Sequence, residues 1–91
     1  MKKVAEVSCE ESGIAMTVST TLPGMHFYTA NYIEETGRGG KGGAVYYPRN
    51  GFCLETQQYP DAIHHPNFPS AVLKAGEKYD HTTSFVFSTI F

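Results

Sequence analysis

The chain has 91 residues, a formal net charge of −2 and 41% hydrophobic residues. This length allows one small domain at most, and its core would be marginal without staples, a metal or a partner. The weak negative charge gives no basis for binding nucleic acid or an anionic membrane surface. No apolar run approaches the roughly 20 residues that span a bilayer, and the basic start lacks the apolar stretch of a signal peptide, so we expect a cytoplasmic protein.

The elements, taken in chain order, predict an all-β protein. Period-two alternation and abundant Thr, Val, Tyr and Phe are typical of strands, and Gly or Pro recurs between them. We expect a hairpin over 4–20 that turns at Gly13, further strands at 25–31, 44–47 and 52–58, a short apolar segment at 71–73, and a last strand within 79–91. This gives about six or seven strands and no helix, as in an antiparallel β-sandwich.

Two loops separate these strands. Residues 34–43 carry five of the nine glycines, so we expect a flexible surface loop; they lack the Gly-Lys-Ser/Thr ending of a phosphate-binding loop. Residues 59–70 contain three prolines and should be irregular, with Asp61 capping a turn and His64 and His65 bonding within the loop. The chain starts and ends in strand patterns, which predicts that residues 1–91 are one piece of a larger β-structure.

The cysteines and histidines do not predict a metal site. Cys9 and Cys53 lie far apart in a chain with no expected signal peptide, so we expect free, buried thiols rather than a disulfide. The four histidines are not spaced as zinc ligands, and the adjacent pair His64 and His65 would point to opposite faces of a strand. We therefore expect no metal.

Glu55 is the first candidate for chemistry. Cys53, Glu55 and Gln57 would share one face of a strand, and the more apolar set Phe52, Leu54 and Thr56 the other. A carboxylate on the polar face, beside a loop braced by prolines, could take a proton from a hydroxyl group. The alternative is a solvated strand residue that discourages edge-to-edge aggregation.

His26 and Tyr28 are the next candidates. They would share one face of the strand at 25–31, where an imidazole beside a phenol could hydrogen-bond a sugar hydroxyl or exchange a proton near neutral pH. The alternative is a surface histidine with no special role.

Four segments together resemble a known family. Residues 20–31 are similar to the pattern T-x-P-G-x-Q-x-Y-T-G-N, 52–57 to a strand containing CLETQ, 59–70 to the loop PDA-x-N-x-P-x-FP, and 73–79 to L-x-x-GE-x-Y. The order is the same, and the match covers nearly the whole chain. The chain therefore resembles the C-terminal part of the aldose 1-epimerase (galactose mutarotase) family.

The resemblance implies a fold, an activity and roles. The fold is an antiparallel β-supersandwich that binds a free aldohexose such as galactose or glucose and interconverts its α and β anomers without a cofactor. A glutamate base removes the proton of the anomeric hydroxyl, and a histidine acid protonates the ring oxygen. Glu55 aligns with the base, and His26, Tyr28 and Gln57 are the substrate-binding candidates. Glutamate is ionised at neutral pH, as a base requires.

Three departures bear on this reading. His26 replaces the sugar-binding Gln of the family pattern, His64 replaces the loop Asn, and Ala30 replaces a Gly. The family's catalytic His and a substrate-binding Asp would lie upstream of these residues, and His26 could in principle substitute as acid. We therefore expect weak activity from the chain alone, and association with a complementing N-terminal chain or with its own copies. The alternative function is a non-catalytic carbohydrate-binding or interaction module.

Overall fold

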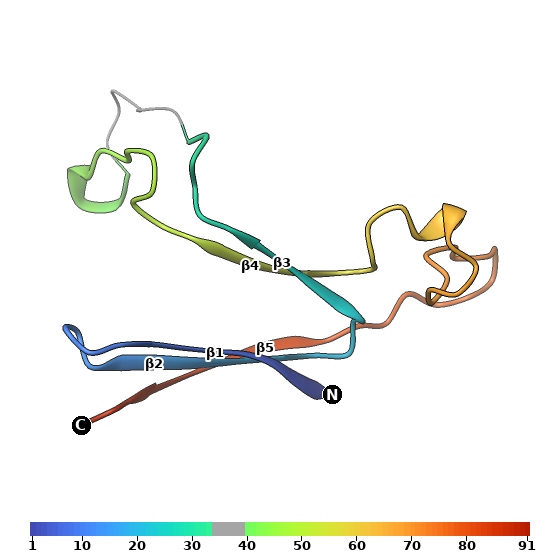
Figure 1. Cartoon of the computed structure of the whole chain (residues 1–91), viewed down its shortest axis with the longest axis horizontal. Helices are drawn as coiled ribbons and strands as arrows, with labels where there is room; N and C mark the ends of the chain where they lie inside the picture. The colour runs from blue at the N-terminus through green and yellow to red at the C-terminus, as the bar shows by residue number, and fades with distance from the viewer. Residues whose placement is uncertain (34–39) are drawn as a thin grey trace. The chain divides into compact units, whose positions relative to one another are not determined.

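The computed structural model describes residues 1–33 and 40–91, and these form strands joined by loops (Figure 1). The strands are β1 (Lys2–Cys9), β2 (Ile14–Thr20), β3 (Gly24–Tyr28), β4 (Cys53–Gln57) and β5 (Thr83–Thr89). Two single 3-10 turns, η1 (Lys41–Gly43) and η2 (Ala62–His64), are the helical segments of the described residues. The all-β prediction is confirmed, whereas the count of six or seven strands was too high for this part of the chain.

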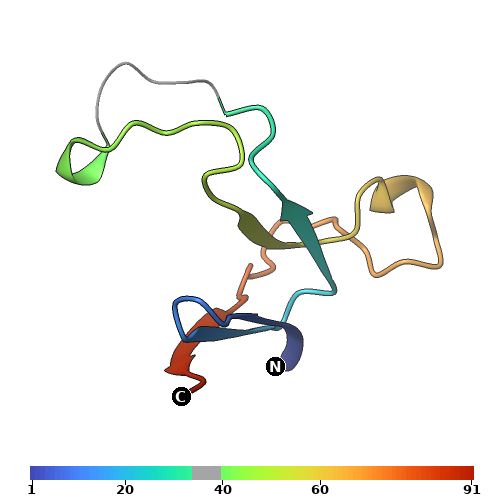
Figure 2. The same ribbon diagram turned by 60° about the vertical axis from the view of Figure 1, so that its left-hand side comes forward.

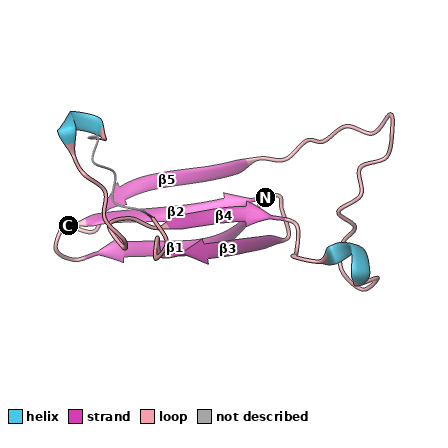
Figure 3. Cartoon of the chain, turned by 90° about the horizontal axis from the view of Figure 1, so that it is seen from above, coloured by secondary structure: helices cyan, strands magenta, loops and turns pink. Residues whose placement is uncertain are grey.

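The strands form two sheets, one with the order β1-β2-β5 and one that pairs β3 with β4. Neighbouring strands run in opposite directions in both sheets (Figure 3). Contacts divide the chain into two units, Met1–Met25 with Thr56–Phe91, and His26–Glu55. The division passes through β3 and β4, so each unit holds part of the small sheet. The packing of the sheets into a sandwich stays a prediction.

The three-stranded sheet begins with the predicted hairpin, whose turn is visible at one end of β1 and β2 (Figure 2). The Gly13 N–H donates to the Cys9 carbonyl at 2.8 Å, and Gly13 has φ +74°, a conformation that favours glycine. The ring of Phe91 lies over it, because a Cβ added to Gly13 would be 2.6 Å from ring carbons. The positive φ therefore favours glycine at this turn, where the Phe91 ring also lies close.

A β-bulge between Lys3 and Ala5 interrupts the β1–β2 register. Residues three apart normally point to opposite faces of a strand, but the extra residue brings Lys3 and Glu6 to the same side. Their side chains form an ion pair at 2.8 Å, which lowers the pKa of the exposed Glu6 carboxyl. The β1 edge of the sheet is thus kinked and charged.

The core of this unit is small. Val18 is fully buried, and Thr20 on the same face of β2 is 1% exposed. Direct pairing places Ala5 and Phe85 on either side of Val18, and Phe87 opposite Met16. Phe85 and Phe87 nevertheless stay largely exposed. The sheet therefore has an apolar face that this chain covers only in part.

Several predicted elements differ in the structure. Residues 44–47 and 71–73 are not strands, and the last strand begins at Thr83, opposite Thr20 at the end of β2. The last backbone hydrogen bond to the neighbouring segment is that from the Thr21 N–H to the Thr82 carbonyl, so the side-chain alternation over 79–81 has no described strand to pair with. The third strand ends at Tyr28 rather than at residue 31. The expected loop at 34–43 lies largely outside the described residues, and residues 41–43 form η1.

Both cysteines are free, as predicted, but neither is buried. Cys9 and Cys53 are exposed because each lies at a strand end, where nothing covers it. Hydrogen bonds from the backbone and side chain of Ser12 lower the pKa of the Cys9 thiol. In the described residues, no helix is long and apolar enough to cross a membrane.

Ala30 terminates β3 in the other unit. It is 1% exposed and has φ +63°, and its carbonyl accepts hydrogen bonds from the N–H groups of Arg49, at 3.0 Å, and Ile33, at 3.4 Å. The left-handed backbone turns the chain out of the strand, which explains why the strand is shorter than its alternation predicts. The position where the family pattern has glycine is thus one where an alanine is strained.

Replacing Ala30 with glycine should raise the free energy of unfolding. A left-handed L-residue costs roughly 1–2 kcal/mol, and the added chain entropy of glycine offsets part of this, so we expect a gain of about 0.5–1 kcal/mol. Urea unfolding followed by circular dichroism measures it. Ala62→Gly is the matched control, because Ala62 is also buried but lacks a positive φ. The control should lose about 1 kcal/mol. A loss of stability in both variants would contradict strain at Ala30.

Candidate functional site

Glu55 lies in the middle of β4. Its side chain is exposed, whereas the neighbouring Leu54 and Thr56 are half-buried, as the predicted alternation requires. Among the hydrogen bonds and ion pairs of the described residues, none involves the Glu55 carboxylate. A carboxylate held on a strand without a protein partner keeps its acceptor positions free for a ligand. An exposed side chain was expected at Glu55 under both hypotheses, a catalytic base and a solvated strand residue.

His26 and Tyr28 lie on β3, the strand that pairs with β4. His26 is exposed and Tyr28 is half-buried. The hydroxyl oxygen of Tyr28 accepts a hydrogen bond from the Tyr32 N–H at 3.1 Å, which holds the ring in place and leaves its O–H free to donate. The structure therefore brings two of the predicted substrate-binding residues onto the strand beside Glu55.

Gln57 ends β4 and is half-buried. Its backbone carbonyl lies near Gly24, where an added Cβ would be 3.4 Å from the oxygen and 3.0 Å from the Tyr59 ring. The side-chain oxygen of the next residue, Gln58, is buried and has no hydrogen-bond partner among the described residues. This unpaired acceptor was not anticipated, and no sequence pattern distinguishes it from the adjacent glutamine.

A chain of threonine hydroxyls anchors β4 one residue beyond Glu55. The Thr56 hydroxyl lies 2.7 Å from that of Thr83, which lies 2.9 Å from that of Thr20. Thr20 also donates to the Thr82 carbonyl at 3.2 Å and accepts from the Leu22 N–H at 3.1 Å. A hydroxyl has one proton, so Thr20 must accept from Thr83, and Thr83 must accept from Thr56. No local pattern predicts this series of hydroxyls, because its members are far apart in sequence.

The loop after β4 is held by contacts among its own side chains, as predicted for His64 and His65, but the Asp61 side chain makes no capping hydrogen bond. Asp61 has φ +57°, and its carboxylate contacts the imidazole of His64 and lies 3.4 Å from Nε2 of His65. The Phe68 ring packs against His65 and Tyr59, with centroids 4.8 and 5.0 Å away. No group of three or more potential ligands in the described residues could hold a metal ion.

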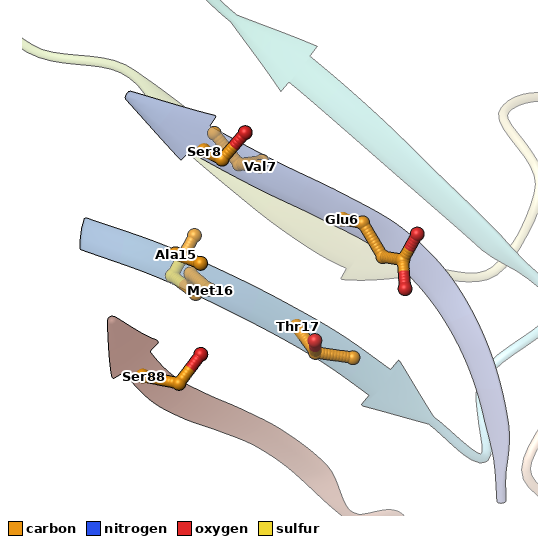
Figure 4. Close-up of a pocket in the computed structure, with 7 residues that line it drawn as sticks. All are labelled: Glu6, Val7, Ser8, Ala15, Met16, Thr17 and Ser88. Carbon is orange, nitrogen blue, oxygen red and sulfur yellow. The ribbon is translucent and has the colours of Figure 1, made fainter. Parts of the chain in front are cut away.

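Two hollows in the described part of the surface are not lined by Glu55. One of about 460 Å³ lies over β1, β2 and β5 and is lined mainly by small and polar side chains, including Glu6, Thr17 and Ser88 (Figure 4). A second, of about 480 Å³, lies near Thr20, Pro23 and Tyr59. Neither is lined by His26, Tyr28 or Glu55. The assignment of Glu55 therefore depends on its strand and its sequence context.

Comparison with known proteins decides the family. The profile described as aldose 1-epimerase matches residues 1–86. The chain belongs to the aldose 1-epimerase family. It is 52% identical over 84 residues to galactose mutarotase of Homo sapiens, a match that covers 92% of this chain and 24% of the relative.

Two further relatives support membership of the same family. Galactose mutarotase of Mus musculus is 49% identical over 87 residues, which cover 96% of this chain and 25% of the relative. Aldose 1-epimerase of Escherichia coli (strain K12) is 31% identical over 88 residues, which cover 94% and 25%. The chain thus spans about a quarter of the length of these relatives. The resemblance to the family is confirmed, whereas the roles of Glu55, His26, Tyr28 and Gln57 stay predictions.

Thr83 joins the hydroxyls of Thr20 and Thr56, so we expect the free energy of unfolding to be sensitive to substitution of Thr83. Thr83→Val keeps the shape but leaves the hydroxyls of Thr20 and Thr56 without this partner, so we expect a loss of roughly 1–3 kcal/mol in the free energy of unfolding. Thr83→Ser keeps the hydroxyl and should lose less. Thermal and urea unfolding of both variants measure the difference. A valine variant at least as stable as the serine variant would show that the hydroxyl chain adds nothing to stability.

Proposed function

We propose that this chain supplies the general-base strand of an aldose 1-epimerase, with Glu55 as the base that acts on the anomeric hydroxyl of a free hexose such as galactose or glucose. The observation that carries the proposal is the exposed, unpartnered carboxylate on β4 in a chain that matches the family over residues 1–86. Relatives named galactose mutarotase and aldose 1-epimerase support this substrate class. A cytoplasmic location belongs to the same proposal.

The strand pairing supports a joint role for Glu55 and His26. β3 and β4 are antiparallel and have five residues each, and Gly24 lies beside the carbonyl of Gln57. Aligning the two strand ends in this way would set His26 directly opposite Glu55. Side chains that face each other across an antiparallel pair have Cβ atoms about 4.5–5.5 Å apart. A sugar hydroxyl could then contact both groups.

In the proposed reaction, the Glu55 carboxylate accepts one proton and later returns it. Glu55 would take the proton of the hydroxyl on C1 while an acid protonates the ring oxygen, and the bond between C1 and that oxygen breaks to give the open aldehyde. Rotation about the C1–C2 bond and reclosure by the reverse proton transfers give the other anomer. Each well-placed acid or base contributes about 10²–10⁴-fold. Tyr28 and Gln57 would bind other hydroxyls of the sugar.

The acid is proposed to come from outside this set of residues. Many large apolar side chains are at least a third exposed, among them Phe85, Phe87 and Ile14 on one face of the three-stranded sheet. Such a surface is typical of a protein that associates. We propose that a complementing N-terminal chain of the same family supplies the acid. His26 is the internal alternative.

The second candidate function is binding of a carbohydrate without catalysis. The same exposed groups on β3 and β4 support it, since they need only hydrogen-bond a sugar. The two functions differ in their need for a carboxylate at position 55. Binding tolerates an amide there, whereas proton abstraction does not.

The test of Glu55 is a graft into a relative. Residues 1–86 replace the matching segment of the human galactose mutarotase, and the decay of optical rotation of fresh α-D-galactose is followed. We expect the graft to be active and Glu55→Gln to lower kcat by about 10²–10⁴-fold, because the amide cannot accept the proton. Glu10→Gln, in the β1–β2 turn, is the matched control and should leave kcat unchanged. A folded graft in which both variants have equal activity would exclude Glu55 as the base.

The same graft tests His26. His26→Gln restores the residue of the family pattern, so we expect KM for galactose to fall several-fold with kcat nearly unchanged. If His26 were instead the acid, kcat would fall and the alkaline limb of the pH–rate profile would change. Comparing kcat and KM separately distinguishes a contact from a proton donor. The binding function would be favoured by two results together. The parent graft would show no turnover, and the Glu55→Gln variant would still bind galactose.

A further inference from the structure

The two edges of the three-stranded sheet differ in chemistry. The β1 edge carries Lys2, Lys3 and Glu6 and a bulge, features that discourage pairing with another strand. The β5 edge has neither, since residues 82–91 contain no Asp, Glu, Lys or Arg and no proline. An uncharged strand rich in aromatic and β-branched residues at an open edge is a template for another strand.

The free hydrogen-bonding groups of β5 can be assigned. The Thr21 N–H donates to the Thr82 carbonyl, and the Ile90 N–H donates to the Gly13 carbonyl. Residues at alternate positions of an antiparallel ladder direct both backbone groups to the same neighbour, so the even-numbered residues of β5 face β2. The backbone groups of Thr83, Phe85, Phe87 and Thr89 therefore point to the edge of β5 that pairs with no strand among residues 1–33 and 40–91.

The sequence of β5 reads the same in both directions. Thr-Ser-Phe-Val-Phe-Ser-Thr is symmetric about Val86. When two copies of such a strand pair antiparallel about a twofold axis at Val86, every residue faces its own type. Phe85 then faces Phe87 of the second copy, and Thr83 faces Thr89 of the second copy. These are the residues whose backbone groups are free, so the palindrome and the hydrogen-bonding pattern require the same register.

We propose that the chain forms a twofold dimer through β5, which joins two three-stranded sheets into one of six strands. This surface lies outside the proposed catalytic residues. About eight backbone hydrogen bonds would form, two for each facing pair of outward residues. Phe85 and Phe87, which are 48% and 66% exposed, would cover one another on one face. The outer edges of the dimer are the charged β1 strands, so assembly stops at two copies.

Val86 gives the test. It is 59% exposed and faces its own copy at the axis, where the two Cβ atoms would be about 4.5–5.5 Å apart. Val86→Lys sets two like charges together and should weaken dimerisation at least about 10-fold. Ser8→Lys is the matched control, because it adds the same charge to the same sheet face at the β1 edge. It should leave the dimer intact.

Sedimentation velocity of the full 91-residue chain, over a range of concentrations, measures the association. We expect a monomer–dimer equilibrium for the parent chain and for Ser8→Lys, and monomers for Val86→Lys and Val86→Glu separately. Mixing these two position-86 variants should restore a one-to-one dimer, which also shows that both are folded. A parent chain that stays monomeric, a dimer indifferent to Val86→Lys, equal dissociation by Ser8→Lys, or no recovery on mixing would each overturn the proposal.

Discussion

The hydroxyl of Thr20 is the constraint on which much of this chain depends. It is buried, and its three hydrogen-bonding positions are all used by Leu22, Thr82 and Thr83. Through Thr83 it reaches Thr56, the residue after Glu55. A buried hydroxyl that loses a partner costs more than one exposed to water, so the three threonines act as one cooperative unit. The end of β2, the start of β5 and the end of β4 are therefore fixed together.

This polar junction matters more because the apolar core is so small. Among the described residues, Val18 is the one large apolar side chain that is fully buried, while both phenylalanines of β5 are largely exposed. Buried apolar area supplies most of the stability of an ordinary domain, at roughly 25 cal/mol per Å². In the described residues, the hydrogen bonds at the sheet end and the glycine turn at Gly13 hold the strand ends where little apolar area is buried. The exposed apolar faces are consistent with a chain that gains stability by associating.

Local patterns predicted the parts of the fold that depend on local interactions. The alternation over 4–20 and the position of Gly13 gave the hairpin, and the alternation over 52–58 gave the exposure of Glu55. The strand predictions were wrong where a partner that is distant in sequence determines whether a strand forms and where it begins. β5 starts at Thr83 because its partner β2 ends at Thr20, and residues 44–47 have strand-like composition but pair with no strand of the described residues. The hydroxyl chain could not be predicted, because the pairing of Thr20 with Thr83 is itself non-local.

In the candidate site, too, local patterns predicted some features, and non-local strand pairing determines the rest. The motif around CLETQ identified Glu55, and alternation placed Gln57 on its face, but only the pairing of β3 with β4 brings His26 to the neighbouring strand. Two kinds of partner strand would compete for the unpaired edge of β5. Its outward backbone groups can pair with one strand at a time, so a second copy and any strand of a complementing chain would exclude each other there. By mass action, the concentration and affinity of each partner decide which is bound. Pairing with either partner would cover the uncharged, aromatic edge of β5, which is otherwise a template for further strands.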